Sequence, residues 1–252
     1  MKQPIHHLIP ATLLLTLSGV ALGQSSAELS IRGEIVPPAC RIALSQAVVD
    51  LGTHSYSKLH ATFVTVLPTQ EVQMNIECDG PVTVAFRAAN NRASSIIPDM
   101  QLPPGVAASR TFGASNGYSA GFTDRSAAAL GFAVADDPAS KIGMVETALD
   151  LDRMIVDGEN LNATGKALAF STSTTRLPTS RSATFSTAMV ALTGPSWYVM
   201  QRQSGQREST FAPYKNLSVP VVLMPALAPK TGLPANQEIA LDGSVTFELR
   251  YF

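Results

Sequence analysis

The amino-acid sequence predicts an all-β protein built from antiparallel strands. Val, Thr, Ser, Ala and Gly are abundant, whereas Lys and Glu, which favour long amphipathic helices, are sparse. Several segments alternate between apolar and polar residues, as the strands of a half-buried sheet do. Seventeen prolines and 17 glycines supply the turns and strand ends between them. These features together indicate antiparallel β structure.

The first residues predict a secretory signal peptide. Lys2 supplies a positive charge, residues 8–20 form an apolar run, and Ala21-Leu22-Gly23 provides a cleavage site with small residues. We therefore expect residues 1–23 to be removed and residues 24–252 to form a single exported domain, although a buried N-terminal helix is the alternative. No later stretch has the roughly 20 apolar residues of a membrane-spanning helix.

The predicted strands begin soon after the cleavage site. Residues 29–35 alternate between apolar and polar side chains, and Pro37-Pro38 ends this first strand. A second run covers residues 41–51, and a third covers residues 62–67 and stops at Pro68.

The strand over residues 71–78 has the clearest pattern. Its apolar positions, which include Cys78, share one face, and its polar positions share the other. Asp79-Gly80 predicts a tight turn into residues 82–86, so the two segments should form a hairpin.

The middle of the chain gives weaker signals. Residues 104–141 are rich in Gly, Ala and Ser; a strand over 131–135 and a helix over 126–130 are both arguable. Residues 171–188 are dominated by Ser and Thr, which suit exposed β structure or a loop. Asp157-Gly158 predicts a second hairpin turn. Further strands are expected at 196–201, at 217–224 with an end at Pro225, and at 244–251.

The chain has only two cysteines, Cys40 and Cys78, and an exported protein would join them in a disulfide. Closing that loop should stabilise the fold by about 4 kcal/mol. The alternative is a pair of reduced thiols.

Composition and motifs argue against most other chemistry. The formal net charge is −1 and no basic patch stands out, so we expect no nucleic-acid partner. We also expect no metal, no cofactor and no enzymatic activity. The only histidines after residue 23 are His54 and His60, and there is no G-x-S-x-G motif. An acidic group at residues 150–159 lacks the spacing of an EF-hand loop.

Aromatic residues offer one candidate ligand surface. Trp197 and Tyr198 would stack on the rings of a surface glycan if they are exposed, whereas buried they are ordinary sandwich core. Tyr118, Phe211 and Tyr214 are further aromatic residues of the same region.

Four segments resemble fimbrial subunits of the chaperone–usher pathway. Residues 29–40 are similar to the first strand running into the first pilin cysteine, and residues 49–52 are similar to the short segment that follows. Residues 72–78 are similar to the strand with the second cysteine, and residues 243–252 to the C-terminal pilin strand, with Tyr251 next to last. Residues 90–210 carry no such likeness.

The resemblance implies an immunoglobulin-like, pilin-type sandwich with a long central elaboration and no final strand. A periplasmic chaperone would lend that strand, and another fimbrial subunit would later replace it, with assembly at an outer-membrane usher. It also implies a location in the periplasm and then on the surface of a Gram-negative cell. Candidate groove or chaperone-facing residues are then Val245, Phe247, Leu249 and Tyr251, which alternation alone would place in the core of a complete strand.

Two features depart from polymerising pilins. Only residues 24–28 precede the expected first strand, and none is a large apolar residue, so we expect that this subunit does not donate a strand in the usual way. It would then lie at a fibre tip or be free-standing. The chain is also longer than an ordinary pilin domain. The sequence thus predicts a non-enzymatic adhesion or fibre subunit acting by strand complementation; the alternative is an exported carbohydrate-binding or carbohydrate-processing β protein.

Overall fold

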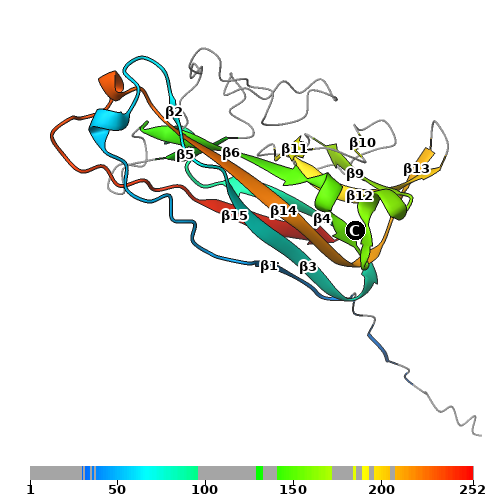
Figure 1. Cartoon of the computed structure of the whole chain (residues 1–252). Helices are drawn as coiled ribbons and strands as arrows, with labels where there is room; N and C mark the ends of the chain where they lie inside the picture. The colour runs from blue at the N-terminus through cyan, green and yellow to red at the C-terminus, as the bar shows by residue number, and fades with distance from the viewer. Residues whose placement is uncertain are drawn as a thin grey trace, which may run out of the picture. The chain divides into compact units, whose positions relative to one another are not determined.

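The computed structural model describes residues 30, 32–34, 36, 38–95, 129–132, 141–171, 184–185, 189–192, 196–204 and 208–251 (Figure 1). The chain divides into two units, Met1–Val36 and Pro37–Phe252. The predicted signal peptide, Tyr118 and most of the Gly-rich middle lie outside the described residues. The prediction of a single domain over 24–252 stays a prediction.

The described residues of the first unit are not in a strand. Ser30, the segment 32–34 and Val36 are all exposed and have no β pairing. The expected strand over 29–35 is therefore wrong at these positions, and the sandwich begins at Cys40. Alternation and the resemblance of residues 29–40 to a first pilin strand both predicted that strand, but a strand also needs pairing with a neighbouring strand.

Within the described part of the second unit, one antiparallel sheet has nine strands. Its main path runs from β1 (Cys40–Leu44) through β3 (Gln70–Val82), β14 (Tyr214–Leu227) and β6 (Gly143–Asp150) to β11 (Met189–Ala191). The shorter strands β2 (Thr65–Val66), β5 (Ala129–Phe132), β7 (Ile155–Val156) and β8 (Glu159–Asn160) pair beside this path.

The second sheet contains six of the described strands. Its order is β10 (Thr184–Phe185), β9 (Lys166–Ser171), β12 (Trp197–Ser204), β4 (Val84–Asn90) and β15 (Val245–Tyr251), and β13 (Glu208–Phe211) pairs with β12. Short 3-10 helices occur at Tyr56–Lys58 (η1), Ala93–Ser95 (η2), Leu151–Arg153 (η5), Leu161–Ala163 (η6) and Lys230–Gly232 (η7).

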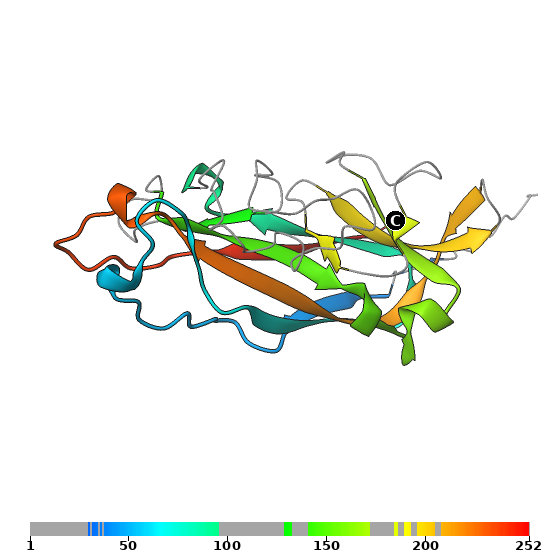
Figure 2. The same ribbon diagram turned by 45° about the horizontal axis from the view of Figure 1, so that its top comes forward.

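The two sheets pack face to face around one main core. That core combines Met74 and Ile76 of β3 and Val219 of β14 with Phe86 of β4 and Met200 of β12. Figure 2 shows the two layers, with β14 in orange and β15 in red. The predicted all-β sandwich is confirmed. Among the described residues, no helix has the length and apolar character needed to cross a membrane.

The predicted hairpin at Asp79-Gly80 is wrong. β3 continues through both residues to Val82, and β4 then begins in the other sheet, so the chain crosses the sandwich there. Gly80 is not among the residues with positive φ, although a tight two-residue hairpin turn of the expected type needs such angles. The apolar face of β3 runs on into β4, and burial of that face on both sheets outweighs the local turn signal.

The second predicted turn is confirmed. Asp157 and Gly158 have φ of 55° and 89°, and they join the paired strands β7 and β8. In the weak middle region, the described residues 129–132 form a strand and not a helix. The predicted strand over 41–51 ends already at Leu44, and the strand predicted to stop at Pro225 continues to Leu227. Pro225 still accepts a hydrogen bond on its carbonyl from the N–H of Leu67.

Candidate functional site

The predicted disulfide is present and lies at one end of a seam between the two sheets. Cys40 at the start of β1 is bonded to Cys78, its partner in register on β3. The N–H of Cys40 donates to Tyr251 Oη (2.7 Å), and the Tyr251 hydroxyl donates to Cys40 O (3.3 Å). The start of β1 is thereby fastened to the end of β15.

Beyond this clasp, β1 has an edge that no described strand pairs with, since its partner is β3 alone. Ser45 N–H donates to the carbonyl of Gln73, directly opposite in register (2.8 Å). Along an antiparallel strand, residues whose backbone groups hydrogen-bond to the neighbouring strand alternate with residues whose backbone groups face the other side. Ile42 and Leu44 therefore direct their backbone N–H and C=O groups toward the open edge.

β15 has a matching free edge, because the described strand that pairs with it is β4. Asn91 N–H donates to Ser244 O (3.1 Å), which sets the alternation along the strand. Val245, Phe247 and Leu249 consequently direct their backbone groups away from β4. Among the described strands, the seam is thus flanked on both sides by an edge that pairs with no further strand.

The opposite, polar face of β15 is held by its neighbours. Arg87 of β4 donates from Nε to Glu248 Oε2 (2.7 Å). The guanidinium groups of Arg87 and Arg250 lie 4.7 and 5.9 Å from the centre of the Trp197 ring. These contacts fix the register of β15, so its apolar residues are directed at the core and the seam.

A groove of about 980 Å³ opens along this seam. One wall, which we call the first wall, consists of Leu44 at the end of β1 and residues 46–54 after it. The second wall consists of residues 233–234 and 237–244, which precede β15, with Val245 and Phe247 of β15 itself. In Figures 1 and 2 both segments extend from β1 and β15 toward the same end of the sandwich, on the left of each view. The floor consists of core side chains from both sheets: Val72, Ala88, Ile142, Val145, Thr147, Val221, Leu223 and Leu227.

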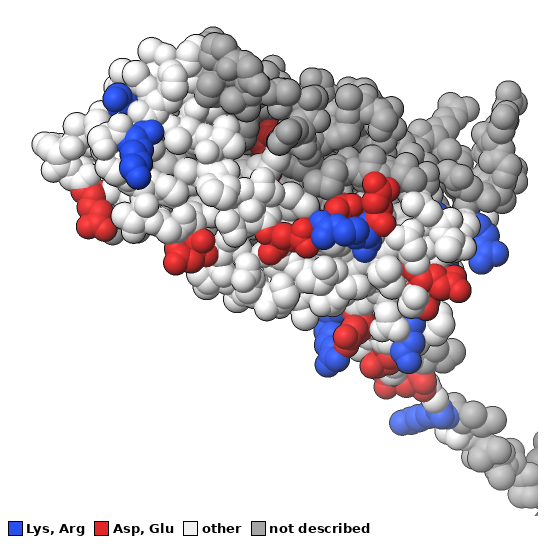
Figure 3. All heavy atoms as spheres, viewed as in Figure 1, with Lys and Arg blue, Asp and Glu red and all other residues white. Residues whose placement is uncertain are grey.

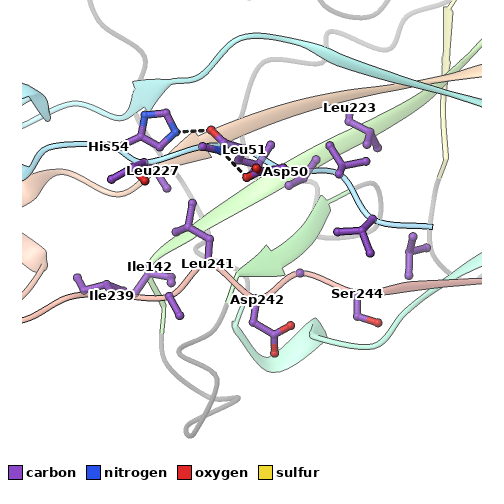
Figure 4. Close-up of a pocket in the computed structure, with 18 of the residues that line it drawn as sticks. Asp50, Leu51, His54, Ile142, Leu223, Leu227, Ile239, Leu241, Asp242 and Ser244 are labelled. Atoms are coloured by element: carbon purple, nitrogen blue, oxygen red, sulfur yellow. Dashed lines mark hydrogen bonds between the residues drawn. The ribbon is translucent and has the colours of Figure 1, made fainter. Parts of the chain in front are cut away.

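The groove is apolar in its depth and polar at its rim. Figure 4 shows Leu241 of the second wall and Leu223 and Leu227 of β14 around the same space. The side chain of His54 lies at the first wall, where its Nε2 donates to Leu51 O (2.8 Å). The groove can therefore accept an extended chain whose alternate side chains are apolar.

The four predicted groove residues have different positions. Val245 and Phe247 line the groove. Leu249 packs against the main core and is not among the described lining residues. Tyr251 is 42% exposed and forms the clasp with Cys40 rather than a groove wall.

Sequence reasoning missed both groove walls beyond the strands. Val48, Val49 and Leu51 follow β1, and Ile239 and Leu241 precede β15, all in segments without regular strand structure. The apolar residues of 41–51 predict a continuous strand, and such a pattern gives no indication of a loop that lines a groove.

The two predicted ligand-facing aromatic residues are buried. Tyr198 is 1% exposed and stacks on Phe86 with ring centroids 5.7 Å apart, and Trp197 is 6% exposed. Neither ring is open to solvent in this structure, so the buried alternative describes both positions.

His54, His60 and Asp157, which were considered for catalysis or metal binding, have local partners. His60 accepts backbone N–H bonds on Nδ1 from Thr62 and Phe63. Asp157 accepts N–H bonds from the backbone of β14 and pairs with Lys166 (3.0 Å). Within the described ranges, no group of three His, Cys, Asp or Glu side chains is placed to hold a metal ion.

The fold and site thus describe an antiparallel β-sandwich with one disulfide and an open seam. A family model described as "Protein of unknown function (DUF1120)" matches residues 29–146, which include both cysteines and the first wall. Protein GltF of Escherichia coli (strain K12) is 30% identical over 92 residues, which cover 34% of this chain and 36% of that protein. The matched region thus spans about a third of that relative's length. No solved structure matches the chain significantly.

Proposed function

We propose that this chain is an exported, non-enzymatic structural subunit that binds a β-strand of another polypeptide in the groove between β1 and β15. The observation that carries the proposal is the open seam, with unpaired strand edges on both sides and core side chains at its floor. Such an edge gains backbone hydrogen bonds from an added strand, and the groove takes up alternate side chains of that strand.

The expected occupant is an extended strand with apolar residues at alternate positions. β1 and β15 run antiparallel, because the start of one meets the end of the other at the Cys40–Tyr251 clasp. A strand between them would be parallel to one and antiparallel to the other, and would join the two sheets. Its inward side chains would cover Leu223 and Val221 at the floor.

The resemblance to fimbrial subunits supports the same role. By that resemblance, the partners are a periplasmic pilus chaperone, an outer-membrane usher and other fimbrial subunits, and the location is the periplasm and then the cell surface. The expectation that this subunit cannot donate a strand assumed that residues 29–35 belong to the sandwich. Because the sandwich begins at Cys40, that reason is removed.

Thermal unfolding of the purified full chain tests the proposal. A peptide of about nine residues with Ile or Val at alternate positions and Thr between them serves as the added strand. At 100 times its Kd, such a peptide stabilises the fold by about 2.7 kcal/mol. For a chain of this size, the Tm should rise by about 5–10 °C.

A matched pair of variants locates the binding site. Ala47 lines the groove, whereas Ala43 lies on the exposed face of β1 and is not among the lining residues. Ala47→Trp should reduce the Tm shift, and Ala43→Trp should leave it unchanged. No Tm shift with the unchanged protein, or the same shift in both variants, would contradict the proposal.

A further inference from the structure

The two walls of the groove carry acidic side chains toward the end that lies away from the clasp. Asp50 stands on the first wall and Glu238 on the second, and both are exposed. Figure 3 shows acidic groups along the lower left edge, where Figure 1 places these two segments. None of the described lining residues is Lys or Arg. Lys58 of η1 and Lys230 of η7 belong to neighbouring helices and do not line the groove.

The charges of Asp50 and Glu238 are not neutralised within the described structure. Asp50 accepts one bond from the uncharged backbone N–H of Gly52 (2.8 Å). Glu238 has neither a hydrogen bond nor an ion pair among the described residues. A third lining carboxylate, Asp242, is different because Arg92 donates to it (Nε to Oδ2, 3.0 Å). Two negative charges therefore remain at this end.

We propose that the strand bound in this groove carries Lys or Arg where it passes between Asp50 and Glu238. The inference rests on the proposed function and adds the charge of the partner to it. A strand laid along the walls displaces water from both carboxylates, so a cation beside them is favoured and an anion is repelled. The partner is thus an apolar strand with a basic end.

This charge preference also separates one partner from another. Residues 29–36 of a second copy of this chain contain one basic residue, Arg32, and one acidic residue, Glu34. The two charges cancel, so that segment gains no electrostatic advantage in the groove. A different polypeptide is the expected partner, and the segment from a second copy is a competitor in the test.

The test uses the full chain and three fluorescent peptides that share the alternating Ile/Thr sequence. The two outward positions near one end are both Lys, both Thr or both Glu, and each peptide is also made with the pair at the other end. Two exposed ion pairs should give the Lys peptide a Kd about 3- to 10-fold lower than that of the Thr peptide. The Glu peptide should bind more weakly than both, and the differences should shrink at about 0.5 M salt.

Variants of the walls identify the groups responsible. Asp50→Asn combined with Glu238→Gln should abolish the preference for Lys while keeping the affinity for the Thr peptide. The control Glu159→Gln, on β8 and outside the groove lining, should keep the preference. A peptide of residues 29–36 should bind no better than the Thr peptide. Equal Kd values for all three charge forms overturn this inference alone, whereas no binding by any peptide overturns the proposed function with it.

Discussion

Glu146 on β6 is a buried carboxyl group whose replacement by Gln should change how stability depends on pH. The residue is 6% exposed, and its Oε2 atom has no hydrogen-bond partner. Its neighbour in register across the sheet is Met224 of β14, which is also buried. Burial disfavours the charged form and raises the pKa of Glu146 from its ordinary 4.5 to about 7.

The size of the effect follows from that difference in pKa. The folded state holds the proton of Glu146 up to a pH of about 7, whereas the unfolded chain releases it near 4.5. The contribution of Glu146 to stability is therefore most favourable below its unfolded pKa of 4.5 and falls as the pH rises toward 7. Above that pH the loss reaches about 3 kcal/mol. Glu146→Gln removes this loss because the amide carries no charge at any pH.

Chemical denaturation at pH 5 and at pH 8.5 measures the effect. From pH 5 to pH 8.5, the free energy of unfolding should fall by about 2–3 kcal/mol more in the unchanged protein than in the Glu146→Gln variant. Other titrating groups are common to both proteins and cancel in the comparison. The control Glu159→Gln alters an exposed residue and should retain the full pH dependence. If Glu146→Gln loses as much stability as the unchanged protein, the burial argument is refuted.

Three further predictions concern the disulfide, the clasp between Cys40 and Tyr251, and the turn at Asp157. Replacing both Cys40 and Cys78 with Ala should lower the free energy of unfolding by about 4 kcal/mol, measured by denaturation against the oxidised protein. Tyr251→Phe removes both hydrogen bonds of the clasp, so the Kd of the alternating peptide should rise about 3- to 10-fold and the free energy of unfolding should fall by about 1 kcal/mol. An unchanged Kd would contradict a role for the clasp in peptide binding. Asp157→Ala should cost about 2 kcal/mol because the carboxylate accepts two backbone N–H bonds and pairs with Lys166. Burial acts to raise the pKa of Asp157, but these hydrogen bonds and the Lys166 pair outweigh burial, so the pKa is lowered. The stability that the Asp157 carboxylate contributes is therefore present above the ordinary pKa of 3.8 and is lost as the pH falls below it. Unfolding curves measured over a series of pH values check this loss.

Features that depend on neighbouring residues were predictable from the sequence. The alternation in β3 places Cys78 on the buried face, and the disulfide with Cys40 follows. Asp157-Gly158 adopts the turn that its residue types favour, since both have positive φ. The regular pattern of β15 likewise predicted its length and the inward position of Val245, Phe247 and Leu249, although Tyr251 at its end is exposed. In each case, the local preference of the backbone and the burial of apolar side chains favour the same structure.

Other features depend on which segments meet in space, and only the tertiary structure decided them. Asp79-Gly80 has the residues of a turn, yet it stays extended because the apolar face on either side is buried in two different sheets. The walls around Leu51 and Leu241 have no regular period, so the sequence could not show that they face each other across a groove. Sheet order determines that β1 and β15 become neighbouring free edges, and this order arises from contacts between residues some 200 positions apart. Sequence therefore determined the all-β class and the buried faces of the most regular strands, whereas long-range packing decided where several strands begin and end and which strands become neighbours.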